Sequence, residues 1–225
     1  VNIMGASKLL MEKIIISMKD KFRVSTARFA NVAFSNGSLL DGFTYRLEKK
    51  QPLSCPLDIK RFFVTPKQSG QICILATFLG KSGDIFFPKL DFYKDQIYFK
   101  DLAIDFLKEN QLDPLIFNSE EKAKNFDFKK NINKYPLFLF KTDTSGEKQY
   151  EEFYTEDETY ELNKFDSIGY IISKSQDINY LKLINDFDSI FNSERMTKND
   201  IINMIKKYLP EFNHIEKGKH LDQKM

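Results

Sequence analysis

The sequence predicts an α/β fold, on three observations. Segments whose apolar residues recur at helical spacing alternate with short runs of β-branched and aromatic residues. Glycine, proline and asparagine separate these segments, as turn residues do. Hydrophobic residues make up 42% of the 225 residues and charged residues 29%, which is typical of a globular chain with a core. Helices and strands in alternation indicate an α/β sandwich.

Local end signals place the elements of the first 122 residues. Ser38 follows a turn and is suited to cap a helix, and Thr65 followed by Pro66 is a strong helix start. Gly80 ends that second helix. Pro52 and Pro56 interrupt the chain before the next strand. In order, we predict a helix over 4–21, an extended segment over 22–34, a helix over 39–47, a strand at 61–64, a helix over 66–79, a strand at 85–87, a helix over 101–107 and a strand at 115–117.

The composition changes after about residue 122. Residues 124–135 are polar and rich in asparagine, which predicts a linker or a mobile excursion. Thr197 and Asp200 have the spacing of a capping box. We therefore divide the chain into residues 1–122 and a C-terminal α+β extension over 123–225. In the extension we predict strands at 136–140 and 168–172 and helices over 180–191 and 197–209.

Charge and composition exclude several functions. Lysine and arginine total 34 and acidic residues 32, a net charge of +2, which argues against a dedicated nucleic-acid binder. No apolar run approaches the roughly 20 residues of a membrane helix.

Two cysteines, Cys55 and Cys73, do not make a disulfide framework, so we expect a reducing, cytoplasmic setting. Because the chain opens with Val1 and enters a helix almost at once, we expect it to be the C-terminal portion of a longer protein.

Met4 and Lys8 lie four residues apart in the first predicted helix and therefore share one face. Taken alone, they fit a core methionine and a solvated lysine. Three further motifs change this interpretation. In order, the four motifs are residues 2–8 (NIMGASK), 27–31 (ARFAN), 35–38 (SNGS) and 58–65 (DIKRFFVT). Together, over residues 1 to about 108, they resemble the second half of nucleotide-sugar 4,6-dehydratases, in the polysaccharide-biosynthesis branch of the extended short-chain dehydrogenase/reductase superfamily.

The resemblance implies the C-terminal part of an extended Rossmann-like fold, with a mixed α+β substrate-binding region. In most of the superfamily the helix carries Tyr-x-x-x-Lys, with the tyrosine as acid/base and the lysine on the nicotinamide ribose of NAD. Here Met4 stands at the tyrosine position, and a thioether has no titratable proton. The resembling branch includes dehydratases with methionine there, whose acid/base segment and glycine-rich dinucleotide loop would precede Val1. Lys8 keeps the implied cofactor role, and Met4 shapes the site.

The resemblance implies contacts to the diphosphate of a nucleotide sugar from three parts of the chain. Asn31 follows an extended segment, at the end of a strand where α/β folds bind ligands, although an ordinary turn asparagine has the same pattern. Ser35, Asn36 and Ser38 would add donors at a helix N-terminus. Arg61 lies among apolar residues and needs an anionic partner. That partner is either the pyrophosphate or the nearby Asp58.

The extension resembles a narrower group, the dehydratases of legionaminic-acid-type pathways. The resemblance rests on residues 136–148 (PLFLFKTDTSGEK), 152–156 (EFYTE) and 218–225 (GKHLDQKM). The extension also contains a cluster of acidic residues. We interpret this cluster as a solvated face and not as a metal site, because no histidine or cysteine lies near it. We assign His214 and His220 structural roles, and expect the extension to make an oligomer contact or to cover the sugar site. The acidic residues are Glu151, Glu152, Glu156, Asp157 and Glu158.

The function implied by the resemblance is an NAD-dependent lyase reaction. It would remove water from UDP- or GDP-linked N-acetylglucosamine to give the 4-keto-6-deoxy sugar, in a homo-oligomer. A nucleotide-sugar 4-epimerase, and a non-catalytic module that binds nucleotide sugar or oligomerises, remain alternatives. Because the glycine-rich loop is not in this sequence, we expect the 225-residue chain alone to bind NAD+ poorly and to be inactive.

Overall fold

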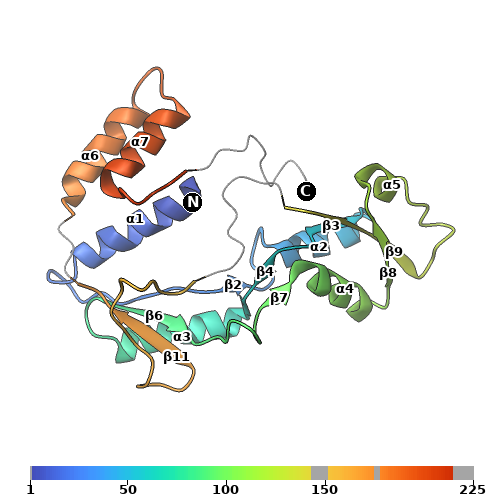
Figure 1. The fold of residues 1–225 in the computed structure, drawn as a ribbon, viewed down its shortest axis with the longest axis horizontal. Helices are drawn as coiled ribbons and strands as arrows, with labels where there is room; N and C mark the ends of the chain where they lie inside the picture. Colours follow the sequence, from blue (N-terminus) through green and yellow to red (C-terminus); the bar gives the residue numbers. More distant parts are fainter. Residues whose placement is uncertain (1, 143–151, 175–177, 215–225) are drawn as a thin grey trace.

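A computed structural model describes residues 2–142, 152–174 and 178–214 (Figure 1). Helices and strands alternate, with parallel strand pairs in three sheets, which confirms the predicted α/β class. The helices are α1 (Ile3–Ser17), α2 (Leu39–Glu48), α3 (Pro66–Leu79), α4 (Phe99–Glu109), α5 (Glu120–Lys124), α6 (Tyr180–Phe191) and α7 (Lys198–Tyr208). The strands are β1 (Thr26–Ala27), β2 (Asn31–Val32), β3 (Leu53–Pro56), β4 (Lys60–Arg61), β5 (Phe63–Val64), β6 (Asp84–Pro88), β7 (Ile97–Tyr98), β8 (Asp113–Phe117), β9 (Lys134–Phe140), β10 (Tyr160–Glu161) and β11 (Ile168–Ile172).

One sheet has the strand order β1-β6-β11-β10, with β1 and β6 parallel and β11 antiparallel to both of its neighbours. Strand β6 is buried throughout, and its alternating side chains face opposite sides. Ile85 and Phe87 pack with Ile16 of α1, while Phe86 packs with Ile72 and other residues of α3. The sheet therefore lies between α1 and α3, and it positions α1 above one face (Figure 1).

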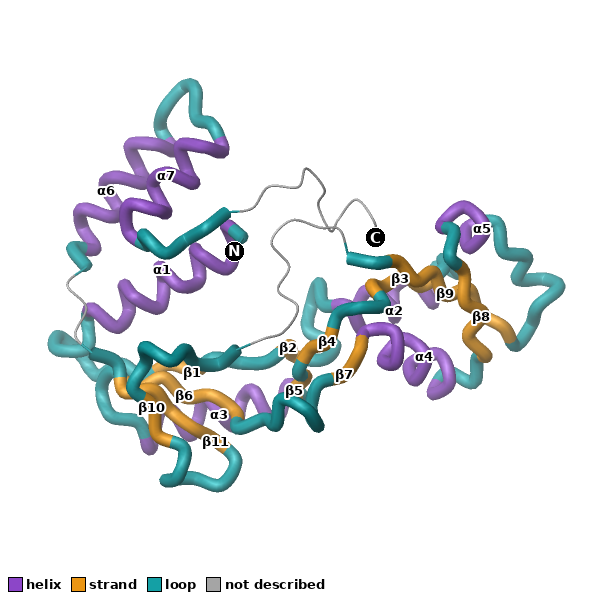
Figure 2. The backbone as a smooth tube through the Cα atoms, in the orientation of Figure 1, coloured by secondary structure: helices purple, strands orange, loops and turns teal. Residues whose placement is uncertain are grey.

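A second sheet, β3-β9-β8, is parallel throughout. Leu53, Cys55 and Leu137 point to one face and form a core with side chains of α2 and α4. Two short pairs, β2 with β5 (parallel) and β4 with β7 (antiparallel), lie between the two larger sheets (Figure 2). These short pairs carry the segments on which we predicted the diphosphate site.

Helices α6 and α7 form an antiparallel hairpin that packs against α1 (Figure 2). Ala6 and Leu10 of α1 are buried with Leu183 of α6 and Ile205 of α7. The predicted capping box at Thr197 and Asp200 is present at the start of α7. The hairpin thus fixes which face of α1 is buried and which face is free for other contacts.

Several predicted elements need correction. A strand, β3, occupies residues 53–56, where two prolines indicated a break; Pro56 is its last residue, and an edge strand tolerates a missing N–H there. Strands β7 and β10 and helix α5 were not predicted, and α1 ends at Ser17, earlier than expected. Strand pairing crosses the proposed division after residue 122, since β9 pairs with β3 and β8, and β11 pairs with β6.

The longest described helix, α1, has 15 residues. Within the part of the chain that the structure describes, every helix is too short or too polar to cross a bilayer.

Candidate functional site

The predicted cofactor face lies on α1. Asn2 caps this helix, its Oδ1 accepting a hydrogen bond from Gly5 N at 2.6 Å. Successive residues turn by about 100°, so Met4, Lys8, Met11 and Ile15 form one stripe, opposite the side buried under α6 and α7. All four are exposed, Met4 to 64%. We call this set the α1 stripe; it carries one ammonium group among three large apolar side chains.

The family resemblance implies a cofactor role for Lys8 on the α1 stripe, and this role stays a prediction. An exposed ammonium has three N–H donors, which suits the hydroxyl oxygens of a ribose. Met4, one turn before it, offers an apolar surface but no proton to transfer. A pocket built on this face must therefore take its acid/base group from another residue.

Asn31 and Arg61 are joined through the main chain of Phe62. Asn31 N donates to the Phe62 carbonyl oxygen at 3.1 Å, and its side-chain Nδ2 lies 3.3 Å from the same oxygen. Arg61 precedes Phe62 and is only 9% exposed. The structure thus places Asn31 and Arg61 on adjacent segments of the chain, whereas Lys8 and Met4 lie on a separate element.

A backbone carbonyl and an aromatic ring hold the Arg61 side chain in place. Its Nη1 donates to the Lys60 carbonyl oxygen at 2.7 Å, and the guanidinium lies 5.9 Å from the ring centre of Phe99. Asp58, the alternative partner, is exposed, and its Oδ1 accepts a hydrogen bond from Thr142 N at 3.0 Å. The predicted anion-binding role of Arg61 therefore rests on a buried guanidinium, the setting in which charge-assisted pairs are strongest.

The turn after β2 satisfies several of its polar groups internally. Ser38 caps α2, its Oγ accepting from Asp41 N at 3.3 Å, and Ser35 Oγ donates to the Val32 carbonyl at 2.8 Å. The Asp41 carboxylate accepts from Gly37 N at 3.0 Å. A phosphate bound at the start of α2 would meet this carboxylate. Asn36 is exposed in the same turn, and the predicted roles of Ser35, Asn36 and Ser38 stay predictions.

A charged cluster that the sequence did not indicate ties α1 to two other segments. The Arg28 guanidinium donates to both oxygens of Glu12, at 2.9 and 2.6 Å, and to both oxygens of Glu158, at 3.0 and 2.7 Å. It also donates to the carbonyl of Phe153 at 2.8 Å. The expectation of a solvated acidic face is wrong for Glu158, because this carboxylate is partly buried and paired.

The pKa values of this cluster follow from its pairing. Burial alone would lower the pKa of Arg28, but the hydrogen bonds and charges of Glu12 and Glu158 raise it above its usual value. Burial alone would raise the pKa of Glu158, but hydrogen bonds from Arg28 and from the Thr155 backbone lower it. Both groups are therefore ionised at neutral pH. The sequence signal was the arginine in the 27–31 motif, whose partners lie 16 and 130 residues away.

A metal site was the alternative interpretation of the acidic cluster. Among the residues that the structure describes, no three histidine, cysteine, aspartate or glutamate side chains are grouped so that they could bind a metal ion. Glu151, His220 and residues 143–148 and 218–225 of the quoted motifs lie outside the described residues. His214 lies near Phe212, with ring centres 6.0 Å apart.

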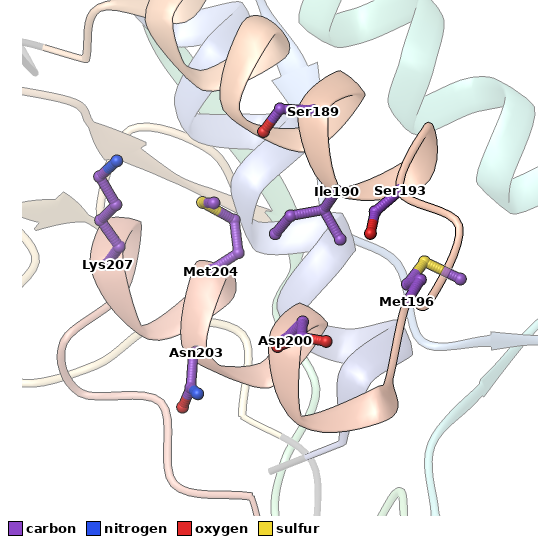
Figure 3. Close-up of a pocket in the computed structure, with 8 residues that line it drawn as sticks. All are labelled: Ser189, Ile190, Ser193, Met196, Asp200, Asn203, Met204 and Lys207. Atoms are coloured by element: carbon purple, nitrogen blue, oxygen red, sulfur yellow. The ribbon is translucent and has the colours of Figure 1, made fainter.

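A cavity of about 490 Å³ lies between α6 and α7 (Figure 3). Ile190 and Met204 line it, and so do the charged residues Asp200 and Lys207. Those two charged groups already have partners, since Asp200 completes the capping box and Lys207 pairs with Asp186. None of the predicted site residues lines this cavity, so it is not the candidate site.

Comparison with known proteins identifies the family of the chain. Residues 1–173 match the family model described as "Polysaccharide biosynthesis protein". The chain is 31% identical over 174 residues to an uncharacterized membrane protein of Methanocaldococcus jannaschii, covering 75% of this chain and 46% of that protein. It is 26% identical over 188 residues to a UDP-glucose 4-epimerase of Rickettsia bellii. That match covers 81% of this chain and 48% of the epimerase. The chain thus spans about half the length of the curated relatives it matches.

A solved structure, titled "X-ray structure of Pen from Bacillus thuringiensis", has a similar fold, with a TM-score of 0.55 at 24% identity. The likeness covers 75% of this chain and 47% of that one, and it supports the predicted fold class. Because the family model covers more than half of the chain, the match to it decides the classification. The chain belongs to the polysaccharide biosynthesis protein family.

Proposed function

We propose that the protein to which this chain belongs is an NAD-dependent 4,6-dehydratase of nucleotide-activated N-acetylglucosamine, a lyase. The observation that carries the proposal is the α1 stripe, which presents Lys8 for the cofactor and, at Met4, a side chain that cannot titrate. The family match and the similarity to a nucleotide-sugar epimerase support a nucleotide-sugar substrate. Dehydration of this kind is the reaction implied by the motifs that resemble the dehydratase branch.

In this proposal the residues of this chain bind the cofactor and the substrate or orient them. Lys8 donates to the ribose of the cofactor, and Asn31 and Arg61 hold the substrate diphosphate from the segment around Phe62. NAD+, when bound, supplies reversible hydride acceptance. Met4 packs against the reacting sugar and excludes water without taking part in proton transfer. The acid/base group comes from outside the α1 stripe.

A second candidate is a nucleotide-sugar 4-epimerase, which the named relative from Rickettsia bellii favours. The mass of the product separates the two. The full-length protein, incubated with UDP-N-acetylglucosamine or its GDP counterpart, should give a product lighter by one water in mass spectrometry. A product of unchanged mass with inverted C4 would replace the dehydratase by the epimerase.

A further inference from the structure

We propose that a basic cavity at the end of α2 binds the phosphoryl group of a small molecule. The cavity has a volume of about 400 Å³ and lies between the end of α2, the start of β3, and α5. We call it the basic cavity; the residues that carry the argument are Arg46, Lys50, Ser54, Glu120, Lys124 and Phe138. None of them belongs to the predicted cofactor or diphosphate residues, so the inference is independent of the proposed function.

The register of the second sheet separates the basic cavity from the core. Ser54 of β3 pairs with Phe138 of β9, and both line the cavity. Their neighbours Leu53, Cys55 and Leu137 point to the opposite face, where α2 and α4 cover them. The cavity therefore reaches the face of the sheet that α2 and α4 leave open.

The charges that line the cavity are not balanced. Lys124 pairs with Glu120 at 2.6 Å, which accounts for one cation and the one carboxylate of the lining. Arg46 Nη1 donates to the Pro52 carbonyl oxygen at 3.0 Å. Within the described ranges, neither Arg46 nor Lys50 forms an ion pair with a carboxylate, and Glu120 is already paired with Lys124. A guanidinium with most of its five N–H donors unused, beside an ammonium, is the arrangement that binds oxyanions.

The backbone that carries these two cations is held in place. The buried Tyr135 hydroxyl donates to the Gln51 carbonyl oxygen at 2.9 Å and lies 3.1 Å from that of Arg46. Lys50 N donates to Leu47 O at 3.1 Å and Gln51 N to Arg46 O at 2.8 Å, the two hydrogen bonds that close a helix C-terminus. Binding an anion here would cost little ordering of the main chain.

The dimensions and lining favour a phosphate ester. The volume lies within the range of about 300–1,000 Å³ found for small-molecule sites. Two cations without a carboxylate partner match the charge of about −1.5 to −2 that a phosphate monoester carries at neutral pH. Pro52 and Phe138 give an apolar surface on which the remainder of the ligand could lie.

The conformation of Lys50 provides a clean test. Its φ is +52°, in the left-handed region, where glycine is favoured over residues with a side chain. Lys50→Gly should therefore remove the ammonium group without unfolding the protein. Gln111→Gly is the matched control, because Gln111 follows α4 in the same way, with φ +60° and the same pair of closing hydrogen bonds.

The 225-residue chain is titrated with inorganic phosphate, glucose 1-phosphate and acetate at constant ionic strength, following backbone amide NMR signals. We expect saturable shifts for phosphate and glucose 1-phosphate at residues 50–54 and 123–124. Lys50→Gly should weaken the affinity about tenfold or more, as removal of a charged hydrogen-bond donor does, while Gln111→Gly leaves it unchanged.

If glucose 1-phosphate binds more tightly than inorganic phosphate, the ligand is a phosphate ester. If the two bind equally, the site recognises the free anion. Both results support the site. Three results would overturn it: no saturable shift at the cavity, the same affinity in both glycine variants, or acetate binding as tightly as phosphate.

Discussion

Arg28 shows how one side chain can organise the candidate site. It joins α1, which carries Lys8, to the segment that leads to Asn31, and it pairs with Glu158 of the C-terminal part. The motif around Arg28 could be identified from the sequence, but its partners could not, because a side-chain pair separated by 130 residues leaves no local pattern. The solvated role given to the acidic cluster failed at Glu158 for the same reason.

Replacing Glu158 by glutamine should destabilise the protein by about 2 kcal/mol, since charge-assisted hydrogen bonds from Arg28 are lost. The pKa of Glu158 is lowered on folding. Its contribution is therefore present above the usual glutamate pKa of about 4.3 and is lost as the pH falls through the folded value. Urea unfolding between neutral and acid pH measures both effects. Glu156→Gln, at an exposed position, is the control; equal losses in the two variants would argue against the cluster.

The two cysteines should differ in reactivity. Cys55 is fully buried, and burial raises the pKa of its thiol to about 12, whereas Cys73 is exposed. A thiol reagent at neutral pH should label Cys73 alone in the native protein, and both after unfolding in urea. Peptide mass spectrometry identifies the labelled residue, and labelling of native Cys55 would contradict the packing of the second sheet.

At the scale of elements, helices were predictable where their ends carry local signals. Ser38, Thr65 and Thr197 cap α2, α3 and α7 as the sequence indicated. The two-residue strands β7 and β10 were missed, because such strands are defined by pairing with distant segments and not by their own composition. Strand β3 was missed because Pro52 and Pro56 were interpreted as breaks.

The hairpin of α6 and α7 should depend on its contact with α1. Ile205 is 2% exposed and packs in the cluster that holds Ala6 and Leu10. Ile205→Ala should cost about 3 kcal/mol, as large-to-small core changes do, and should increase amide hydrogen exchange in α1. Ile184→Ala, at an exposed position of α6, should cost well under about 1 kcal/mol. If exchange in α1 were unaffected by Ile205→Ala, the hairpin would not support that helix.

At the scale of the whole molecule, the proposed function requires the chain to contribute only part of a pocket. It carries an ammonium on the α1 stripe and a buried arginine at Arg61, but its nine glycines include no set of three with the spacing of a dinucleotide loop. Calorimetric titration of the 225-residue chain with NAD+ should therefore show weak binding. Micromolar affinity would mean that this chain holds the cofactor by groups other than those proposed.

We propose that the α1 stripe forms one wall of the cofactor pocket, and the NAD content of the purified full-length protein tests this directly. Lys8→Met should lose bound NAD, lowering affinity by about ten- to a hundredfold for the lost charged hydrogen bonds. Lys13→Met, on another face of the same helix where Lys13 pairs with Glu211 at 3.5 Å, should retain it. Equal NAD content in the two variants would show that Lys8 does not bind the cofactor.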